Sequence, residues 1–141
     1  MKSRETLIRL RRFEVDEKRQ KVADIESMIA DFRQMAVDLE RQIQVEQERA
    51  GVSDVNHFAY PTFAMAAIQR RDNLAASVEG LQTKLERAQD ELTDAFEALK
   101  MVEHNEERGM DRVRGARRKA EQTELDKIGR LAQQASMHHP T

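Results

Sequence analysis

The stretch that decides the fold is VADIESMIADFRQMAVDLERQI, residues 22–43. Its apolar residues recur at alternating steps of three and four, the spacing of the a and d positions of a heptad repeat. They are Val22, Ile25, Ile29, Phe32, Ala36, Leu39 and Ile43. Most of the intervening residues are charged or carry side-chain amides. A helix with one narrow apolar stripe needs a partner helix with a matching stripe.

A matching stripe follows in residues 74–102, again in steps of four and three. Its members are Leu74, Val78, Leu81, Leu85, Ala88, Leu92, Ala95, Leu99 and Val102. Between the two stripes lies one break, residues 51–61. Gly51 there suits the end of a helix, Asp54 suits a turn, and Pro61 suits the first turn of the next helix.

Because this connection is short, the two helices should run in opposite directions, with their apolar stripes facing each other. The sequence therefore predicts an all-α fold, two long helices forming an antiparallel coiled-coil hairpin. We expect a single domain over residues 1–141, with helix one at about 3–50, a tip at 51–61, helix two at about 61–135 and a flexible tail at 136–141. Ser3 is the expected N-cap of helix one.

The composition favours slender, exposed helices over a packed globule. Of the 141 residues, 39% are hydrophobic, 4% aromatic and 35% charged. Disorder is the competing interpretation of such a chain, but the heptad repeat argues against it for the middle of the chain. The absence of cysteine excludes a disulfide framework and a thiolate metal site. The net charge of −2 does not favour nucleic acid as a partner.

The two ends of the chain depart from the main stripes. In the first third of helix one, Arg11 and Lys18 take seam positions, while Leu7, Leu10 and Phe13 lie off the seam among basic residues. After residue 102 the seam decays at Glu106 and Gly109. A basic cluster and a fresh apolar stripe follow: Arg112, Arg114, Arg117, Arg118 and Lys119, then Leu125, Ile128, Leu131, Ala132 and Ala135. Both ends should lie at the same end of the hairpin, as either a partner-binding surface or frayed, solvated helix.

No pattern of catalytic chemistry is present. The chain lacks a glycine-rich phosphate loop and a nucleophile elbow, and its histidines have no partner at a metal-ligand spacing: His57, His104, His138 and His139. We expect no enzymatic activity, no metal and no cofactor. The basic cluster has no interleaved aromatic residues, so nucleic acid is not an expected partner. No stretch approaches the ~18 apolar residues of a membrane span, so we expect a soluble protein without direct membrane insertion.

The predicted tip holds a large share of the aromatic side chains. His57, Phe58 and Tyr60 lie in it, and Phe63 follows at the start of helix two. Aromatic residues at a hairpin tip either form a small hydrophobic plug that caps the helices or serve as an exposed docking knob. The sequence leaves both alternatives open.

Three stretches in order resemble the FliJ family of flagellar type III export proteins, over essentially the whole chain. They are Leu7-Ile8-Arg9-Leu10 before a charged helix, Tyr60-Pro61-Thr62-Phe63 continuing as AMAAIQRRDNL, and ELDKIGRLAQQASMHHP at the end. The resemblance implies a non-enzymatic coiled-coil stalk that stimulates the export ATPase ring and links it to the membrane export gate and to export chaperones. It implies a cytoplasmic location, peripheral at the inner membrane through the export apparatus. A generic coiled-coil scaffold or dimerisation module, and the stalk of a virulence type III secretion system, are the alternatives.

The resemblance also implies two binding surfaces. The ATPase ring would contact the helix ends through Leu7, Leu10, Phe13, Leu125, Ile128 and Leu131. The export gate would contact the start of helix two through Phe63, Ala67, Arg70 and Leu74. Ala67 and Arg70 depart from the family's pattern in size or charge, and Leu74 also belongs to the seam. No residue is assigned to chaperone binding.

Overall fold

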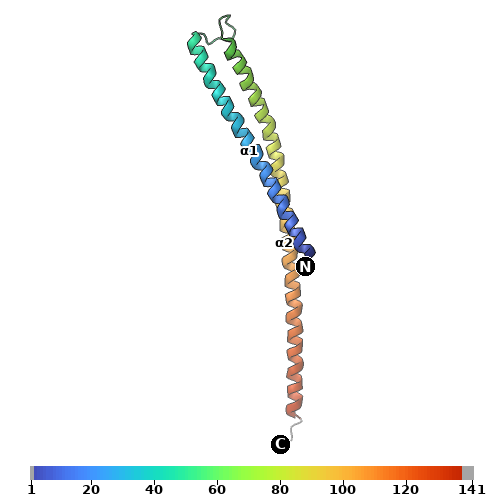
Figure 1. The fold of residues 1–141 in the computed structure, drawn as a ribbon. Helices are drawn as coiled ribbons and strands as arrows, with labels where there is room; N and C mark the ends of the chain where they lie inside the picture. The colour runs from blue at the N-terminus through green and yellow to red at the C-terminus, as the bar shows by residue number, and fades with distance from the viewer. Residues whose placement is uncertain (1, 138–141) are drawn as a thin grey trace.

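The computed structural model describes residues 2–137 and consists of two long helices (Figure 1). α1 spans Lys2–Ala50 and α2 spans Thr62–Met137, and residues 51–61 connect them. Residues 2–137 contain no strand. The predicted all-α fold of two long helices packed against each other is therefore confirmed. Ser136 and Met137 belong to α2, and the rest of the predicted tail, residues 138–141, lies outside the described part of the chain.

The connection ends α1 by backbone geometry that the sequence predicted. Gly51 has a φ of 68°, which favours glycine because it has no Cβ. The Gly51 N–H donates to the Glu48 carbonyl at 3.3 Å, and the Val52 N–H donates to the Gln47 carbonyl at 3.2 Å. This pair of bonds is a Schellman motif, which satisfies the last carbonyls of the helix. At the other end, α1 begins at Lys2, one residue ahead of the cap expected at Ser3.

Contacts between the helices run in opposite chain order. Late in α1, Leu39 and Ile43 pack with Ala67, which lies early in α2. Further back in α1, a second cluster joins residues of the first predicted stripe to later residues of α2: Val22, Ile25, Ile29, Leu81 and Ala88. Figure 1 shows α1 and α2 side by side over this length. The two stripes predicted from the heptad repeat thus form the interface.

The seam on α2 begins earlier than the sequence analysis placed it. Ala64 and Ala67 are 0% and 3% exposed and continue the heptad spacing backward from Leu74. The position between them and Leu74 holds Arg71, whose charge hides the continuity of the stripe. Arg71 donates to Glu40 of α1, and this hydrogen bond raises the pKa of Arg71 above its ordinary value.

The core is one seam of side chains thick. Within residues 2–137, every buried side chain is apolar and none is a large side chain fully sealed from solvent. Each seam residue therefore contributes a large share of the burial that holds the helices together.

We predict that Ile43→Ala lowers the free energy of unfolding by about 2–4 kcal/mol, because the side chain is 2% exposed and its removal leaves a cavity. The matched control is Val45→Ala, whose side chain is 47% exposed and whose removal should change stability by less than about 0.5 kcal/mol. Urea unfolding followed by far-UV circular dichroism measures both. Equal effects of the two substitutions would contradict the seam as described.

Candidate functional site at the open end

The first third of α1 uses its cations to bind α2. Lys18 and Lys21 each place Nζ 3.2 Å from Oε2 of Glu91, and Arg12 lies 3.6 Å from Glu103. Lys18 takes the seam position between Val22 and Val15, which are 9% and 3% exposed, so ion pairs add to an interface that still contains buried apolar residues. The alternative that this basic face serves only a partner or the solvent is therefore wrong for these residues. Exposed pairs are each worth only a few tenths of a kcal/mol, so the buried apolar residues contribute more here than the pairs do.

The two lysines also change the acidity of Glu91. Hydrogen bonds from Lys18, and secondarily from Lys21, hold the pKa of Glu91 below its ordinary value of 4.5. The charged carboxylate is thus favoured in the folded state. The stabilisation that it contributes is present above the ordinary pKa and is lost as the pH falls through the lowered pKa.

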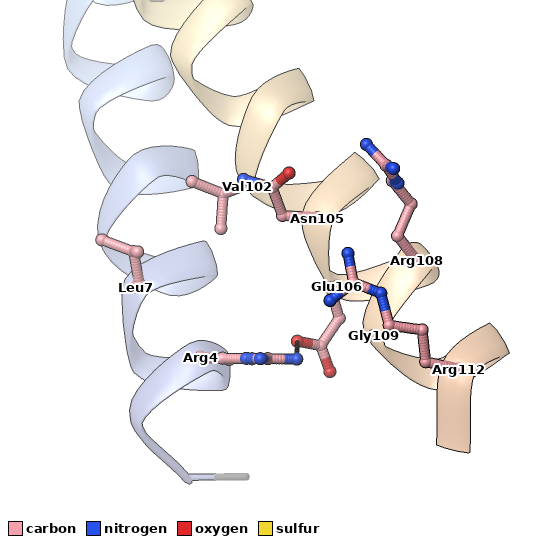
Figure 2. A pocket seen from close by; sticks show the side chains of 8 residues that line it. All are labelled: Arg4, Leu7, Val102, Asn105, Glu106, Arg108, Gly109 and Arg112. Atoms are coloured by element: carbon pink, nitrogen blue, oxygen red, sulfur yellow. Dashed lines mark ion pairs between the residues drawn. The ribbon is translucent and has the colours of Figure 1, made fainter. Parts of the chain in front are cut away.

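At the end opposite the connection, hereafter the open end, Arg4 closes the interface (Figure 2). Its guanidinium lies 3.8 Å from Oε2 of Glu106 and occupies the space that a side chain at position 109 would take. Gly109 is thus the residue that admits Arg4. A groove of about 390 Å³ surrounds this contact, lined by Arg4, Leu7, Val102, Asn105, Glu106, Arg108, Gly109 and Arg112.

Beyond this contact α2 continues alone. Residues 110–137, hereafter the overhang, extend past the N-terminal end of α1 by roughly 40 Å (Figure 1). Every residue from 116 to 136 is exposed. The overhang carries all of the predicted basic cluster and all of the fresh apolar stripe. Of the two described helices, only α2 continues past the Arg4–Glu106 contact as a free arm.

The structure separates the six residues predicted to bind an ATPase. Leu7, Leu10 and Phe13 are 37%, 49% and 59% exposed on the paired part of α1. The other three are 61%, 59% and 64% exposed on the overhang: Leu125, Ile128 and Leu131. Leu125 lies roughly 24 Å along α2 from Gly109, where Arg4 of α1 makes its contact. The two groups are therefore two surfaces, not one.

The four residues predicted to bind the export gate differ in how far their side chains are exposed. Ala67 is 3% exposed and packs with Leu39 and Ile43 of α1. Leu74 is half-buried and packs against the same cluster. Phe63, 57% exposed, and Arg70 keep exposed side chains, one heptad apart. Only these two present their side chains to a partner there.

Of the two roles left open by the sequence, the structure shows the buried plug, at Tyr60, and it leaves the Phe58 ring exposed. Tyr60 is 6% exposed, and its hydroxyl accepts a hydrogen bond of 2.8 Å from the Gln47 side chain, so it acts as the plug. Phe58 is 96% exposed and stacks on His57 with ring centroids 4.6 Å apart. A ring this exposed is available to a partner.

Within residues 2–137, no three His, Asp or Glu side chains gather closely enough to hold a metal ion. Over the same residues, neither helix contains a segment both long and apolar enough to cross a bilayer. Comparisons with protein-family models, curated proteins and solved structures find no match to this chain.

We predict that Glu91→Gln makes the melting temperature depend less on pH below neutral. The melting temperature of the unsubstituted protein should fall as the pH drops from neutral through the lowered pKa of Glu91, because protonation weakens its bonds to Lys18 and Lys21. Thermal melts from pH 7 to about pH 3 measure this. Glu79→Gln, at an exposed position outside these pairs, is the control and should keep the original slope. An unchanged profile in Glu91→Gln would contradict the assignment.

We predict that Gly80→Ala raises the free energy of unfolding by about 1 kcal/mol, because alanine is the better helix former and no atom lies within 4 Å of the new methyl group. Gly109→Ala should raise the free energy of unfolding by less, because the methyl group must displace the Arg4 guanidinium. Adding Arg4→Ala to Gly109→Ala should restore the stabilisation that Gly80→Ala gives. Equal gains for Gly80→Ala and Gly109→Ala in urea unfolding would show that Arg4 does not occupy this space.

Proposed function

We propose that the two packed helices are an antiparallel coiled-coil hairpin that works as a non-enzymatic stalk in a flagellar type III export apparatus. In this proposal the overhang binds and stimulates the export ATPase ring. The hairpin links the ring to the membrane export gate and to export chaperones. The protein would be cytoplasmic and peripheral at the inner membrane through these partners.

The observation that carries the proposal is the overhang. A lone helix with no neighbour along its length, bearing exposed Leu125, Ile128 and Leu131, has apolar surface that the helix pair does not use. An isolated helix in water gains little from its own hydrogen bonds, so a partner that covers this stripe would stabilise it. A ring-shaped partner with a central opening fits a single projecting helix about 10 Å wide. The resemblance to the FliJ family names that partner as the export ATPase.

The opposite end supports a second contact. Phe58, Phe63 and Arg70 are exposed at and beside the connection, at the far end of the helix pair from the overhang. A stalk that holds two partners apart needs binding groups at both ends and a stiff body between them. The continuous seam supplies that body.

A generic coiled-coil scaffold is the second candidate. The seam alone is sufficient for that role, and it requires no specific partner at either end. The stalk of a virulence secretion system uses the same features as the flagellar proposal. The two secretion systems are distinguished by which ATPase responds.

We predict that the protein stimulates its cognate export ATPase, and that the triple variant Leu125→Ser, Ile128→Ser, Leu131→Ser loses most of that stimulation. The matched control replaces three exposed methionines on the helix pair, Met28, Met65 and Met101, by serine. A pull-down and a turnover assay measure binding and stimulation. A separate triple variant at Leu7, Leu10 and Phe13 tests the surface on α1.

Equal melting temperatures of the control and the overhang variant would show that the hairpin survives in both. If the unsubstituted protein neither bound nor stimulated the ATPase, the stalk proposal would fail and the scaffold would take its place. If only the α1 variant lost stimulation, the ATPase contact would lie on the paired part of the hairpin instead of the overhang.

A further inference from the structure

The overhang carries a second heptad pattern, distinct from the seam that binds α1. Its positions follow steps of four and three without interruption: Met110, Arg114, Arg117, Glu121, Glu124, Ile128 and Leu131. The seam toward α1 reaches Gly109 and, one step later, Val113. Met110 follows Gly109 by one residue, about 100° around the helix. The new stripe, hereafter the overhang seam, therefore lies beside the seam that binds α1, and its first residues, Met110, Arg114 and Arg117, share a groove with Arg4 of α1.

The charges along the overhang seam change sign once. Arg114 and Arg117 come first, Glu121 and Glu124 follow, and apolar Met110 and Ile128 bound them. None of the four charged side chains forms an ion pair with another residue of the described chain. Four exposed charges in two blocks of opposite sign are complementary to a partner with the reverse order.

A second copy of this overhang, running in the opposite direction, has that order. Antiparallel heptads place a positions opposite d positions. Met110 then meets Ile128 of the second copy, Arg114 meets Glu124, and Arg117 meets Glu121, each contact occurring twice through a two-fold axis near residue 119. A parallel copy would instead place arginine on arginine and glutamate on glutamate.

We propose that the overhang is a self-association surface, which pairs antiparallel with the overhang of a second copy. The side chains of Met110 and Ile128 are 48% and 59% exposed, and this pairing would cover both. A groove of about 280 Å³ lies beside Met110, between Arg4 of α1 and residues 106–117 of α2. In the proposed pair, Ile128 of the second copy contacts Met110 next to this groove. The pairing spans residues 110–128, slightly under three heptads, and its central positions are Arg–Glu pairs in place of apolar residues, so charge complementarity determines the register.

Self-association is independent of the proposed stalk function and competes with it. Pairing covers Ile128, which the proposed ATPase contact also needs. A dimer would therefore be a form of the protein that has not engaged the ring. The measurement below uses purified protein alone, so its result does not depend on whether an ATPase responds.

The test compares two charge reversals by sedimentation equilibrium at low salt. One variant carries Arg114→Glu and Arg117→Glu, and the other carries Glu121→Lys and Glu124→Lys. In each variant alone, like charges meet across the two-fold axis. We expect the dimer dissociation constant to rise at least about tenfold in both. In an equimolar mixture, opposite charges meet again in both halves of the pair, so heterodimers should form with nearly the original affinity.

The matched control, Arg112→Glu with Lys119→Glu, changes the charge equally on the opposite side of the overhang and should leave the dimer intact. Circular dichroism melts verify that each variant retains the helix pair. A monomeric unsubstituted protein at every accessible concentration would overturn the proposal. So would a dimer that both reversals leave unchanged, or a mixture that fails to restore association, because another face would then carry the contact.

Discussion

Everything in this structure depends on a seam of side chains that is one layer deep. Two helices joined by a short connection bury side chains only along the line where they touch. The seam residues therefore make up the entire hydrophobic core. Near the connection that line is apolar, with Ile43 and Ala64 among its most buried members. Small residues let the helices approach closely, Ala64 and Ala67 near the connection and Ala88 further along α2. The proposed stalk depends on the continuity of this seam.

Toward the open end the same seam changes its chemistry. Lys18 reaches Glu91, and Arg4 reaches Glu106, at positions where the other end has isoleucine or leucine. Exposed ion pairs hold less tightly than buried aliphatic contacts. The interface toward the open end thus combines ion pairs with buried Val15, and it ends at the Arg4–Glu106 pair, beyond which α2 projects.

Much of the fold followed from spacing in the sequence, and the exceptions have a common cause. The apolar a and d positions predicted both helices, and Gly51 predicted where the first one ends. Arg71 and Arg4 occupy seam positions but carry charge, so an apolar pattern does not include them, and Lys18 was identified as a seam position without its partner. Their acidic partners lie on the other helix and are visible only once the helices are aligned. For the same reason, the sequence analysis assigned surface that the seam does not use to both ends of the chain. From the Glu40–Arg71 pair to the Arg4–Glu106 pair the helices advance by almost equal numbers of residues, which leaves only α2 unpaired.

The central claim is that the interface ends where Arg4 meets Glu106 and that α2 continues without a neighbour. Amide hydrogen exchange, measured residue by residue on the Arg114→Glu, Arg117→Glu variant so that the overhang cannot pair with itself, tests this directly. The account predicts slow exchange in residues 15–43 and 64–102, intermediate exchange toward residue 109, and fast exchange from residue 116 onward. Slow exchange that persists through residues 116–136, or an absence of protection in residues 64–102, would contradict it.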